Sequence, residues 1–333
     1  MPKKPESVVR NPLAYLAERW QPSADLVRRT ALATVVMAVV IVVTGGAVRV
    51  TGSGLGCPTW PTCTEESLTA TREMGIHGAI EFGNRLLTYV LCAVVGAAIL
   101  TARARSPWRR SLTRLGWAQF WLIVGNAVLG GITVLTGLNP YTVSGHFLLS
   151  MALITVATVM WQRTREGDGP SNALVAPQVR GLVRALVAAA GVLVAVGTVV
   201  TGAGRHAGDS SDIPRIPVDY VGITRVHALS AWAVVGLTAV VWLVLRRTGA
   251  AHEPRARVRD LLVVLLAQGA IGYVQYFTNV PETLVVVHML GSCLVWIAVL
   301  RVLLALRARP AEQPVPAPGG PALAAGPGLG VVR

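Results

Sequence analysis

Residues 76–100 read IHGAIEFGNRLLTYVLCAVVGAAIL, an apolar run with a few polar side chains near its start. About twenty apolar residues in a helix cross a hydrocarbon core of about 30 Å, and this run is long enough to do so. Its apolar residues are continuous rather than alternating, which indicates a membrane-spanning helix. A carboxylate deep in a bilayer costs on the order of 3 kcal/mol, so Glu81 within this run indicates a functional site.

Seven other apolar runs have a similar length. The chain is 53% hydrophobic and only 14% charged, with a mean hydropathy of +0.56, a balance that excludes an ordinary soluble domain. The sequence therefore predicts an all-α polytopic membrane protein with eight transmembrane helices, at residues 31–50, 76–100, 115–136, 141–161, 181–202, 222–245, 260–279 and 283–306.

The net charge of +14 is explained by topology rather than by a nucleic-acid partner. All but six of the 30 Lys and Arg residues lie in the N-terminal tail, in the second, fourth and sixth loops, or at the C-terminal end. The positive-inside rule places these segments, including both termini, in the cytoplasm. We therefore expect no nucleic acid as a partner and a membrane lipid environment for the helices.

Blocks of sequence recur between the two halves of the chain. Residues 126–130 match 268–272, and residues 144–150 match 286–292, both at an offset of 142. This repeat predicts two tandem, duplicated four-helix bundles that run parallel. We expect a cytoplasmic tail at 1–29, a first bundle at 30–162, a cytoplasmic linker at 163–180, a second bundle at 181–307 and a disordered cytoplasmic tail at 308–333.

The polar residues at the start of the run at 76–100 share one side of the predicted helix. At 100° per residue, His77, Glu81 and Asn84 fall within about 60° of arc, and Arg85 lies just beside them. A salt bridge from Arg85 to Glu81, four residues apart, is one explanation for the carboxylate. The other is chemistry, because a partly buried carboxylate is a group that its surroundings can tune.

The first outer loop carries two cysteines, Cys57 and Cys63, six residues apart. On the oxidising side of a membrane such a pair can form a disulfide. It serves either to close a small loop or as a redox-active dithiol. The matching loop of the second half is shorter and has no cysteine, which favours a role specific to the first half. We expect Cys92 and Cys293, within apolar runs, to be small core residues.

Three histidines lie at one depth, in helices that enter from the outer face. His227 and His288 come from alternate helices of the second bundle, where two imidazoles can face each other as the axial ligands of a haem. Zinc is less favoured because no third or fourth ligand lies beside them. In the first half, His146 corresponds to His288, but Asn84 stands where the partner histidine would be. This asymmetry favours a reacting haem in the first bundle and a permanent one in the second.

Over residues 30–306 the chain resembles haem A synthase, the membrane enzyme family that converts haem O to haem A for cytochrome oxidases. The resemblance rests on the Thr-Gly-Ser-Gly-x-Gly-Cys loop at 51–57 with its second cysteine, on the motif at 81–85, and on the histidines of helices four, six and eight. It implies oxidation of the C8 methyl of haem O to a formyl group by successive hydroxylations, with oxygen drawn from water. Haem b as cofactor, haem O as substrate and an unidentified electron acceptor are implied with it.

Carried over by position, the resemblance makes Glu81 the catalytic residue, Cys57 and Cys63 the loop pair, and His146, His227 and His288 the haem-iron ligands. The first histidine of the family motif falls on Asn84, as in an actinobacterial-like variant. Our hypothesis is that His77 substitutes or assists, or that His146 alone ligates the substrate haem. Electron transfer through the cysteine pair is a further hypothesis.

Two arginines near the outer surface, Arg85 and Arg225, are candidates to bind haem propionates. Anchoring at the membrane interface by snorkelling is the alternative.

Two other functions compete with the synthase. A di-haem electron-transfer protein without its own catalysis would have two symmetric bis-histidine sites, and a transporter would have helices broken at mid-membrane. The family implies haem O synthase and cytochrome oxidase subunit I as partners, and an oligomer is possible. We expect a multi-pass protein of a bacterial plasma membrane, with its haem sites toward the outer leaflet, because no part of the N-terminal segment resembles a transit peptide.

Overall fold

The computed structural model describes residues 12–310, so all but the first three residues of the tail expected at 308–333 lie outside the described part. Within that part, eight helices are long and apolar enough to cross a membrane, which confirms the predicted all-α polytopic fold. They are α3 (Ala24–Val50), α4 (Gly75–Ala104), α5 (Arg110–Leu135), α6 (Pro140–Arg163), α7 (Pro177–Ala203), α8 (Tyr220–Arg247), α9 (His252–Phe277) and α10 (Glu282–Leu304).

Most of these helices extend past the predicted apolar runs because polar turns continue the helix beyond the hydrocarbon. The first run was expected from residue 31, but α3 begins at Ala24, where the side chain of Ser23 accepts a hydrogen bond from the backbone N–H of Leu26 and caps the helix. Short elements complete the fold: α2 (Pro12–Arg19), the 3₁₀ turn η1 (Arg72–Met74), and the strands β1 (Asn172–Ala173) and β2 (Arg307–Ala308), paired antiparallel.

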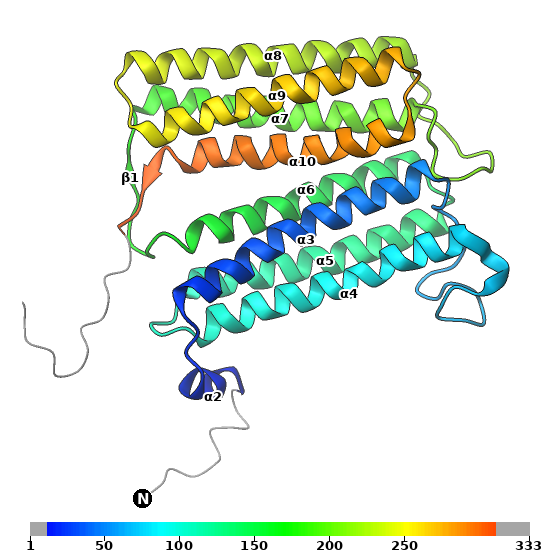
Figure 1. Ribbon diagram of the computed structural model, residues 1–333, viewed down its shortest axis with the longest axis horizontal. Coiled ribbons are helices and arrows are strands. Elements are labelled where there is room, and N and C mark those ends of the chain that lie inside the picture. The colour runs from blue at the N-terminus through cyan, green and yellow to red at the C-terminus, as the bar shows by residue number, and fades with distance from the viewer. Residues whose placement is uncertain (1–11, 311–333) are drawn as a thin grey trace, which may run out of the picture.

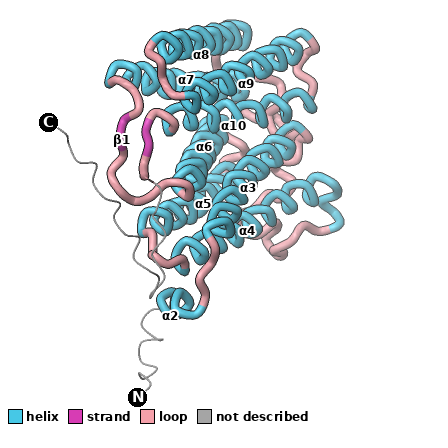
Figure 2. The backbone as a smooth tube through the Cα atoms, turned by 60° about the vertical axis from the view of Figure 1, so that its left-hand side comes forward, coloured by secondary structure: helices cyan, strands magenta, loops and turns pink. Residues whose placement is uncertain are grey.

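The long helices form two rings of four (Figure 1). Helices α3 to α6 each contact the next, and α6 returns to α3; helices α7 to α10 do the same. The rings meet where α10 contacts α3 and α6 and where α6 contacts α7. Figure 2 shows the two rings from another side. The indole N–H of Trp296 on α10 donates to the hydroxyl of Thr155 on α6 at 2.8 Å, which ties the rings together at mid-helix.

Apolar packing fills both rings. One buried cluster lies among α7 to α10, and a second joins α3 to α6 with residues of α10. Cys293 belongs to this second cluster and is fully buried, whereas Cys92 is only partly buried. Because the interior is apolar, polar side chains can gather only near the helix ends unless they are paired.

The turns between α5 and α6 and between α9 and α10 share one backbone form. Gly137 and Leu138 have φ of 60° and 57°, and Asn279 and Val280 have φ of 62° and 61°. These positions lie 142 residues apart, the same offset as the matching sequence blocks. Left-handed backbone is uncommon for residues other than glycine. Two such residues in a row reverse the chain within a short turn, so α5–α6 and α9–α10 each form a tight helical hairpin. The hairpins place His146 and His288 at the seventh residue of α6 and α10.

We call the end of the molecule that carries Cys57 and Cys63 the disulfide end, and the opposite end, with α2 and the β1–β2 pair, the tail end (Figure 1). At the disulfide end the loop between α3 and α4 contacts the loop between α7 and α8. The backbone N–H of Gly54 donates to Gly208 O at 2.7 Å, and Nε of Arg49 donates to His206 O at 2.8 Å. His206 is partly buried, and its Nε2 lies 2.9 Å from Val280 O.

Candidate functional site

Glu81 and Arg85 form an ion pair on α4, as the four-residue spacing suggested. Nη2 of Arg85 lies 2.5 Å from Oε1 of Glu81, and Nε donates to the same oxygen at 3.1 Å. Only 6% of Glu81 is exposed. A buried carboxylate keeps its charge only where partners compensate the lost hydration, and this bidentate guanidinium is such a partner.

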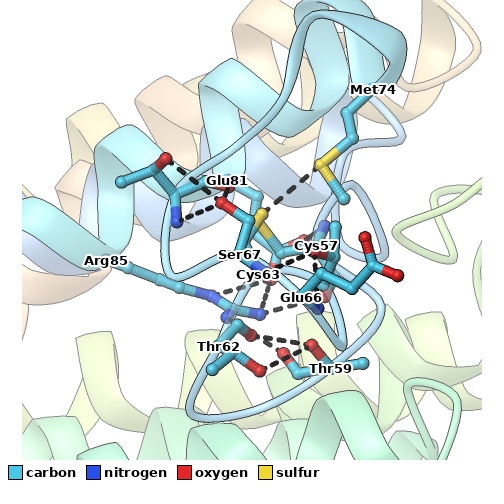
Figure 3. Close-up of a disulfide and its surroundings, with 11 residues drawn as sticks. Cys57, Thr59, Thr62, Cys63, Glu66, Ser67, Met74, Glu81 and Arg85 are labelled. Carbon is cyan, nitrogen blue, oxygen red and sulfur yellow. Dashed lines mark hydrogen bonds and ion pairs between the residues drawn. A yellow bond between two sulfur atoms is a disulfide. The ribbon is translucent and has the colours of Figure 1, made fainter.

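The same arginine holds the cysteine loop (Figure 3). Its Nη1 donates to the carbonyls of Thr59 and Thr62, each at 3.0 Å, and its Nη2 donates to the carbonyl of Cys57 at 3.0 Å. With the two contacts to Glu81, all five guanidinium N–H groups are engaged by the protein. We therefore do not assign Arg85 to a haem propionate.

Cys57 and Cys63 are joined by a disulfide, and both are fully buried. The backbone N–H of Cys57 donates to Oε2 of Glu81 at 2.7 Å, and Met74 Sδ lies 3.5 Å from Cys63 Sγ (Figure 3). The structure therefore brings Glu81, Arg85 and the cysteine pair into one cluster, which we call the carboxylate–disulfide cluster. Spacing along the sequence did not indicate this contact.

Glycines allow the loop to reach α4. A Cβ on Gly56 would collide with the backbone carbonyl of His77, so only glycine permits this close approach at the first turn of the helix. Gly52 has a φ of 65°, a left-handed conformation that glycine adopts without steric cost. On the other side of the loop, the ring of Trp60 packs against Gly131 on α5. The loop thus covers the first ring from α4 to α5.

His77 and Asn84 lie outside this cluster, although they were predicted on the same helix side. The imidazole of His77 is exposed, and its Nδ1 lies 2.9 Å from the hydroxyl of Ser53. Asn84 is partly buried, and its Oδ1 accepts a hydrogen bond of 2.7 Å from the hydroxyl of Thr44 on α3. The side chain of Asn84 is thus oriented by the neighbouring helix.

Each of the three partly buried histidines, His146, His227 and His288, lies against a glycine of the preceding helix. An added Cβ would lie 3.2 Å from Cε1 of the ring at Gly130, 3.1 Å at Gly197 and 3.2 Å at Gly272, beside His146, His227 and His288 respectively. In each ring Nδ1 is buried and has no hydrogen-bond partner among residues 12–310. The rings are therefore positioned by packing against these glycines rather than by a hydrogen bond at Nδ1.

His227 and His288 face each other in the second ring. Their ring centroids are 6.4 Å apart, with 67° between the planes. Two metal–nitrogen bonds of about 2.0 Å, each extended by roughly 1.1 Å to the ring centre, would set the centroids about 6.2 Å apart. The spacing therefore leaves room for one metal ion between the rings.

Some site residues could not be identified from the sequence. The backbone carbonyls that Arg85 binds and the hydroxyl of Thr44 carry no sequence signal. Gly130 and Gly272 did carry one, because they occupy matching places in the repeated blocks, each next to a histidine in the fold. Arg225 is exposed and makes no ion pair within residues 12–310, so its predicted role toward a propionate stays a prediction.

Together these features define a polytopic helical membrane protein with a buried carboxylate–disulfide cluster and glycine-packed histidines at one end. A family model described as "Cytochrome oxidase assembly protein" (COX15-CtaA) matches residues 28–300, and the chain belongs to this family.

Three curated relatives illustrate the similarity. The chain is 26% identical over 278 residues to "Heme A synthase" of Listeria monocytogenes, covering 77% of this chain and 88% of that protein. It is 26% identical over 280 residues to "Heme A synthase" of Listeria welshimeri, with the same shares of each chain. It is 29% identical over 122 residues to "Heme A synthase" of Geobacillus kaustophilus, covering 36% and 37% of the two chains.

Proposed function

We propose that the protein is a haem A synthase, an oxidoreductase that converts haem O to haem A for cytochrome oxidase. The observation that carries this proposal is the carboxylate–disulfide cluster, in which buried Glu81 contacts Arg85 and the backbone of Cys57. Family membership and the relatives named "Heme A synthase" support it.

The proposed reaction oxidises the C8 methyl of haem O in successive hydroxylations. Overall, a methyl group and one water give a formyl group, four protons and four electrons. The protons require a base, and the electrons require an acceptor outside this chain. We propose Glu81 as the base for the protons. The disulfide between Cys57 and Cys63, next to it, would carry the electrons toward the acceptor.

Glu81 is proposed as the catalytic residue, acting as general base or stabilising positive charge near the reacting methyl. Arg85 positions it: the two contacts to Oε1 leave Oε2 to the N–H of Cys57. Because three loop carbonyls bind the same guanidinium, the arginine also fixes the disulfide relative to the carboxylate. A fixed carboxylate needs little reorganisation during proton transfer.

We propose a resident haem b in the second ring, held by His227 and His288. Two observations support the fit: the 6.4 Å ring spacing, and the glycines at 197 and 272 that make space for the rings. When bound, this haem would supply one-electron chemistry beside the first ring. The two histidines would hold its iron.

In the first ring we propose His146 as the ligand to the substrate haem. It lies on Gly130 as His288 lies on Gly272, at the same 142-residue offset. Asn84 is a poor iron ligand, and its carbonyl oxygen is taken by Thr44. A substrate held by one strong ligand can leave after conversion, whereas the doubly ligated haem stays.

We place the protein in a bacterial plasma membrane, with the disulfide end outside. The arginines of the tail end support this orientation through the positive-inside rule, because they cluster in the loops at that end. A disulfide is also stable on the outer side. Haem O synthase and cytochrome oxidase subunit I are the proposed partners, with a separate electron acceptor.

The proposal is tested by extracting and separating haems from cells that express this protein together with a haem O source. We expect haem A with the wild type and at least a 100-fold loss with Glu81→Gln, the scale of a lost general base. The matched control is Glu66→Gln, which changes an exposed glutamate of the loop that carries Cys57 and Cys63. Haem b alone in both wild type and variant, despite supplied haem O, would favour a di-haem electron-transfer protein.

A further inference from the structure

A cavity of about 330 Å³ lies at the tail end, far along the helices from the carboxylate–disulfide cluster. It opens between the first turns of α7 and the last turn of α10. Three arginines and three leucines dominate its lining, which consists of Ser171, Ala173, Arg180, Arg184, Leu303, Leu304, Leu306 and Arg307. We call it the arginine pocket.

Among residues 12–310, none of the three guanidinium groups of the pocket is paired with a protein anion. Arg180, Arg184 and Arg307 form no side-chain hydrogen bond and no ion pair within residues 12–310, and the Nε atoms of Arg180 and Arg307 are buried without a partner. Buried unpaired donors of charged groups are costly. These three cations are therefore suited to bind an anion.

Among residues 12–310, Glu166 is the carboxylate whose charge acts on Arg307, but it forms its ion pairs with other arginines. It lies 3.7 Å from Arg163 and 3.5 Å from Arg309. The two ion pairs already compensate the charge of this carboxylate, so it does not neutralise Arg307 as well. The net charge of the described side chains around the pocket is therefore positive.

Helix geometry adds to the positive field. Arg180 and Arg184 are four residues apart on α7, and like charges at this spacing repel. An anion between the two guanidinium groups would relieve this repulsion.

The leucines show that the ligand is not a bare ion. Leu304 and Leu306 are buried and Leu303 is partly buried, and all three lie where α10 leaves the apolar span. The volume is about ten times that of one liquid water, more than a single phosphate needs. Charge on one wall and hydrocarbon on the other match a molecule with an anionic head and apolar chains.

We propose that the arginine pocket binds the phosphate headgroup of an anionic phospholipid, with the leucines contacting the start of its acyl chains. Basic pockets between helices are suited to such headgroups, and the inner leaflet of a membrane carries anionic lipids. The site is independent of the haem chemistry. Its failure would leave the proposed function untouched.

The test uses the full-length protein in nanodiscs of phosphatidylcholine, with or without phosphatidylglycerol. We expect native mass spectrometry to detect one retained phosphatidylglycerol per wild-type chain, and unfolding several degrees higher in the anionic discs. Replacing the three pocket arginines by Gln should remove both effects. The single variant Arg184→Gln, at an exposed position, should reduce lipid retention several-fold without affecting folding.

The controls separate this site from general electrostatics and from free phosphate. A second triple variant, with Gln at Arg114, Arg247 and Arg259, removes the same charge from exposed positions of the tail end and should keep the lipid. Equal loss in this variant would overturn the proposal. So would a stabilisation by inorganic phosphate in neutral discs as large as that by the lipid, since the site would then bind the free ion.

Discussion

Oε2 of Glu81 accepts a hydrogen bond of 2.7 Å from the backbone N–H of Cys57, one partner of the disulfide. The proposed base and the redox pair are therefore in direct contact. Because this N–H belongs to a disulfide cysteine, a change at the sulfur acts on the bond to the carboxylate even while Arg85 holds the loop in place. Proton and electron steps at this cluster are thus expected to depend on each other.

Removing the cation from this cluster should destabilise the protein. Arg85→Met leaves Glu81 buried without its ion-pair partner, which costs about 3 kcal/mol. The change is measured as the free energy of unfolding in detergent titrations. In a double-mutant cycle, adding Glu81→Gln to Arg85→Met should recover more than about 1 kcal/mol, because the unpaired charge is gone.

Strict additivity of the two substitutions would contradict the ion pair as a stabilising unit. Arg72→Met is the matched control, because Arg72 is exposed on η1 and forms no ion pair within residues 12–310. Its effect should stay within about 0.5 kcal/mol.

Replacing both loop cysteines by alanine should lower haem A formation at least tenfold. The clamp of Arg85 on three loop carbonyls does not involve sulfur, so the loop should keep its place. If the pair carries electrons, a soluble oxidant such as ferricyanide should restore turnover in isolated membranes. Continued inactivity with ferricyanide would mean a structural staple, and normal turnover without it would exclude any redox role.

Glycine-to-valine changes should separate the two haem sites. Gly272→Val should displace His288 and remove the resident haem spectrum, because even a Cβ would lie 3.2 Å from the ring. Gly130→Val should displace His146 and abolish conversion while the resident haem stays. Gly269→Val, one turn from Gly272 with no atom within 4 Å of its Cβ position, is the control. Loss of the resident haem in that control would point to a general folding defect.

His77 should prove dispensable for substrate ligation. Its ring is exposed and is held by Ser53 at the loop. We expect His77→Ala to leave the optical spectrum of bound substrate haem unchanged, and His146→Ala to abolish it. A shifted spectrum with His77→Ala would instead assign His77 as the ligand that stands in for the histidine missing at Asn84.

Stability at the tail end should depend on acid pH. Partial burial acts to raise the pKa of Asp168, but hydrogen bonds from Ser111, Arg109 and Arg163 outweigh it and hold the pKa below its ordinary value. A depressed folded pKa gives stability that is present above the unfolded value, about 3.9, and is lost as the pH falls through the folded value. Thermal melting between pH 3 and 6 measures it.

Asp168→Asn should reduce the fall of the melting temperature between pH 6 and pH 3, because the carboxylate that titrates is removed. Asp212→Asn is a matched exposed control at the disulfide end and should leave the limb unchanged. An unaltered acid limb in Asp168→Asn would assign the loss of stability to other carboxylates.

Most of the fold could be predicted from the sequence because membrane spans are a local property. Twenty apolar residues in a row have few stable arrangements in lipid, so the eight helices followed from composition and length. Their ends were less predictable, because caps such as Ser23 extend helices into water. The ring packing arises from contacts between distant segments.

The candidate site could likewise be predicted from the sequence only in part. The polar exceptions in apolar runs, Glu81 and the histidines, were visible in the sequence because burying them without a function is costly. Helical spacing also predicted the Arg85–Glu81 pair. His77 and Asn84 showed the limit of that reasoning, since sharing a helix side did not bring them into the cluster.

The sequence by itself therefore determined the class of protein, the number of spans and the chemical groups available, because these depend on residue type and short-range period. Only the tertiary structure decided that the disulfide loop folds back onto Glu81, that each of the three partly buried histidines rests on a glycine, and that three arginines surround one pocket. These contacts join residues up to 127 positions apart, from Arg180 to Arg307, or lie between helices. Backbone atoms and the absence of a Cβ set their geometry, and neither leaves a periodic signal in the sequence.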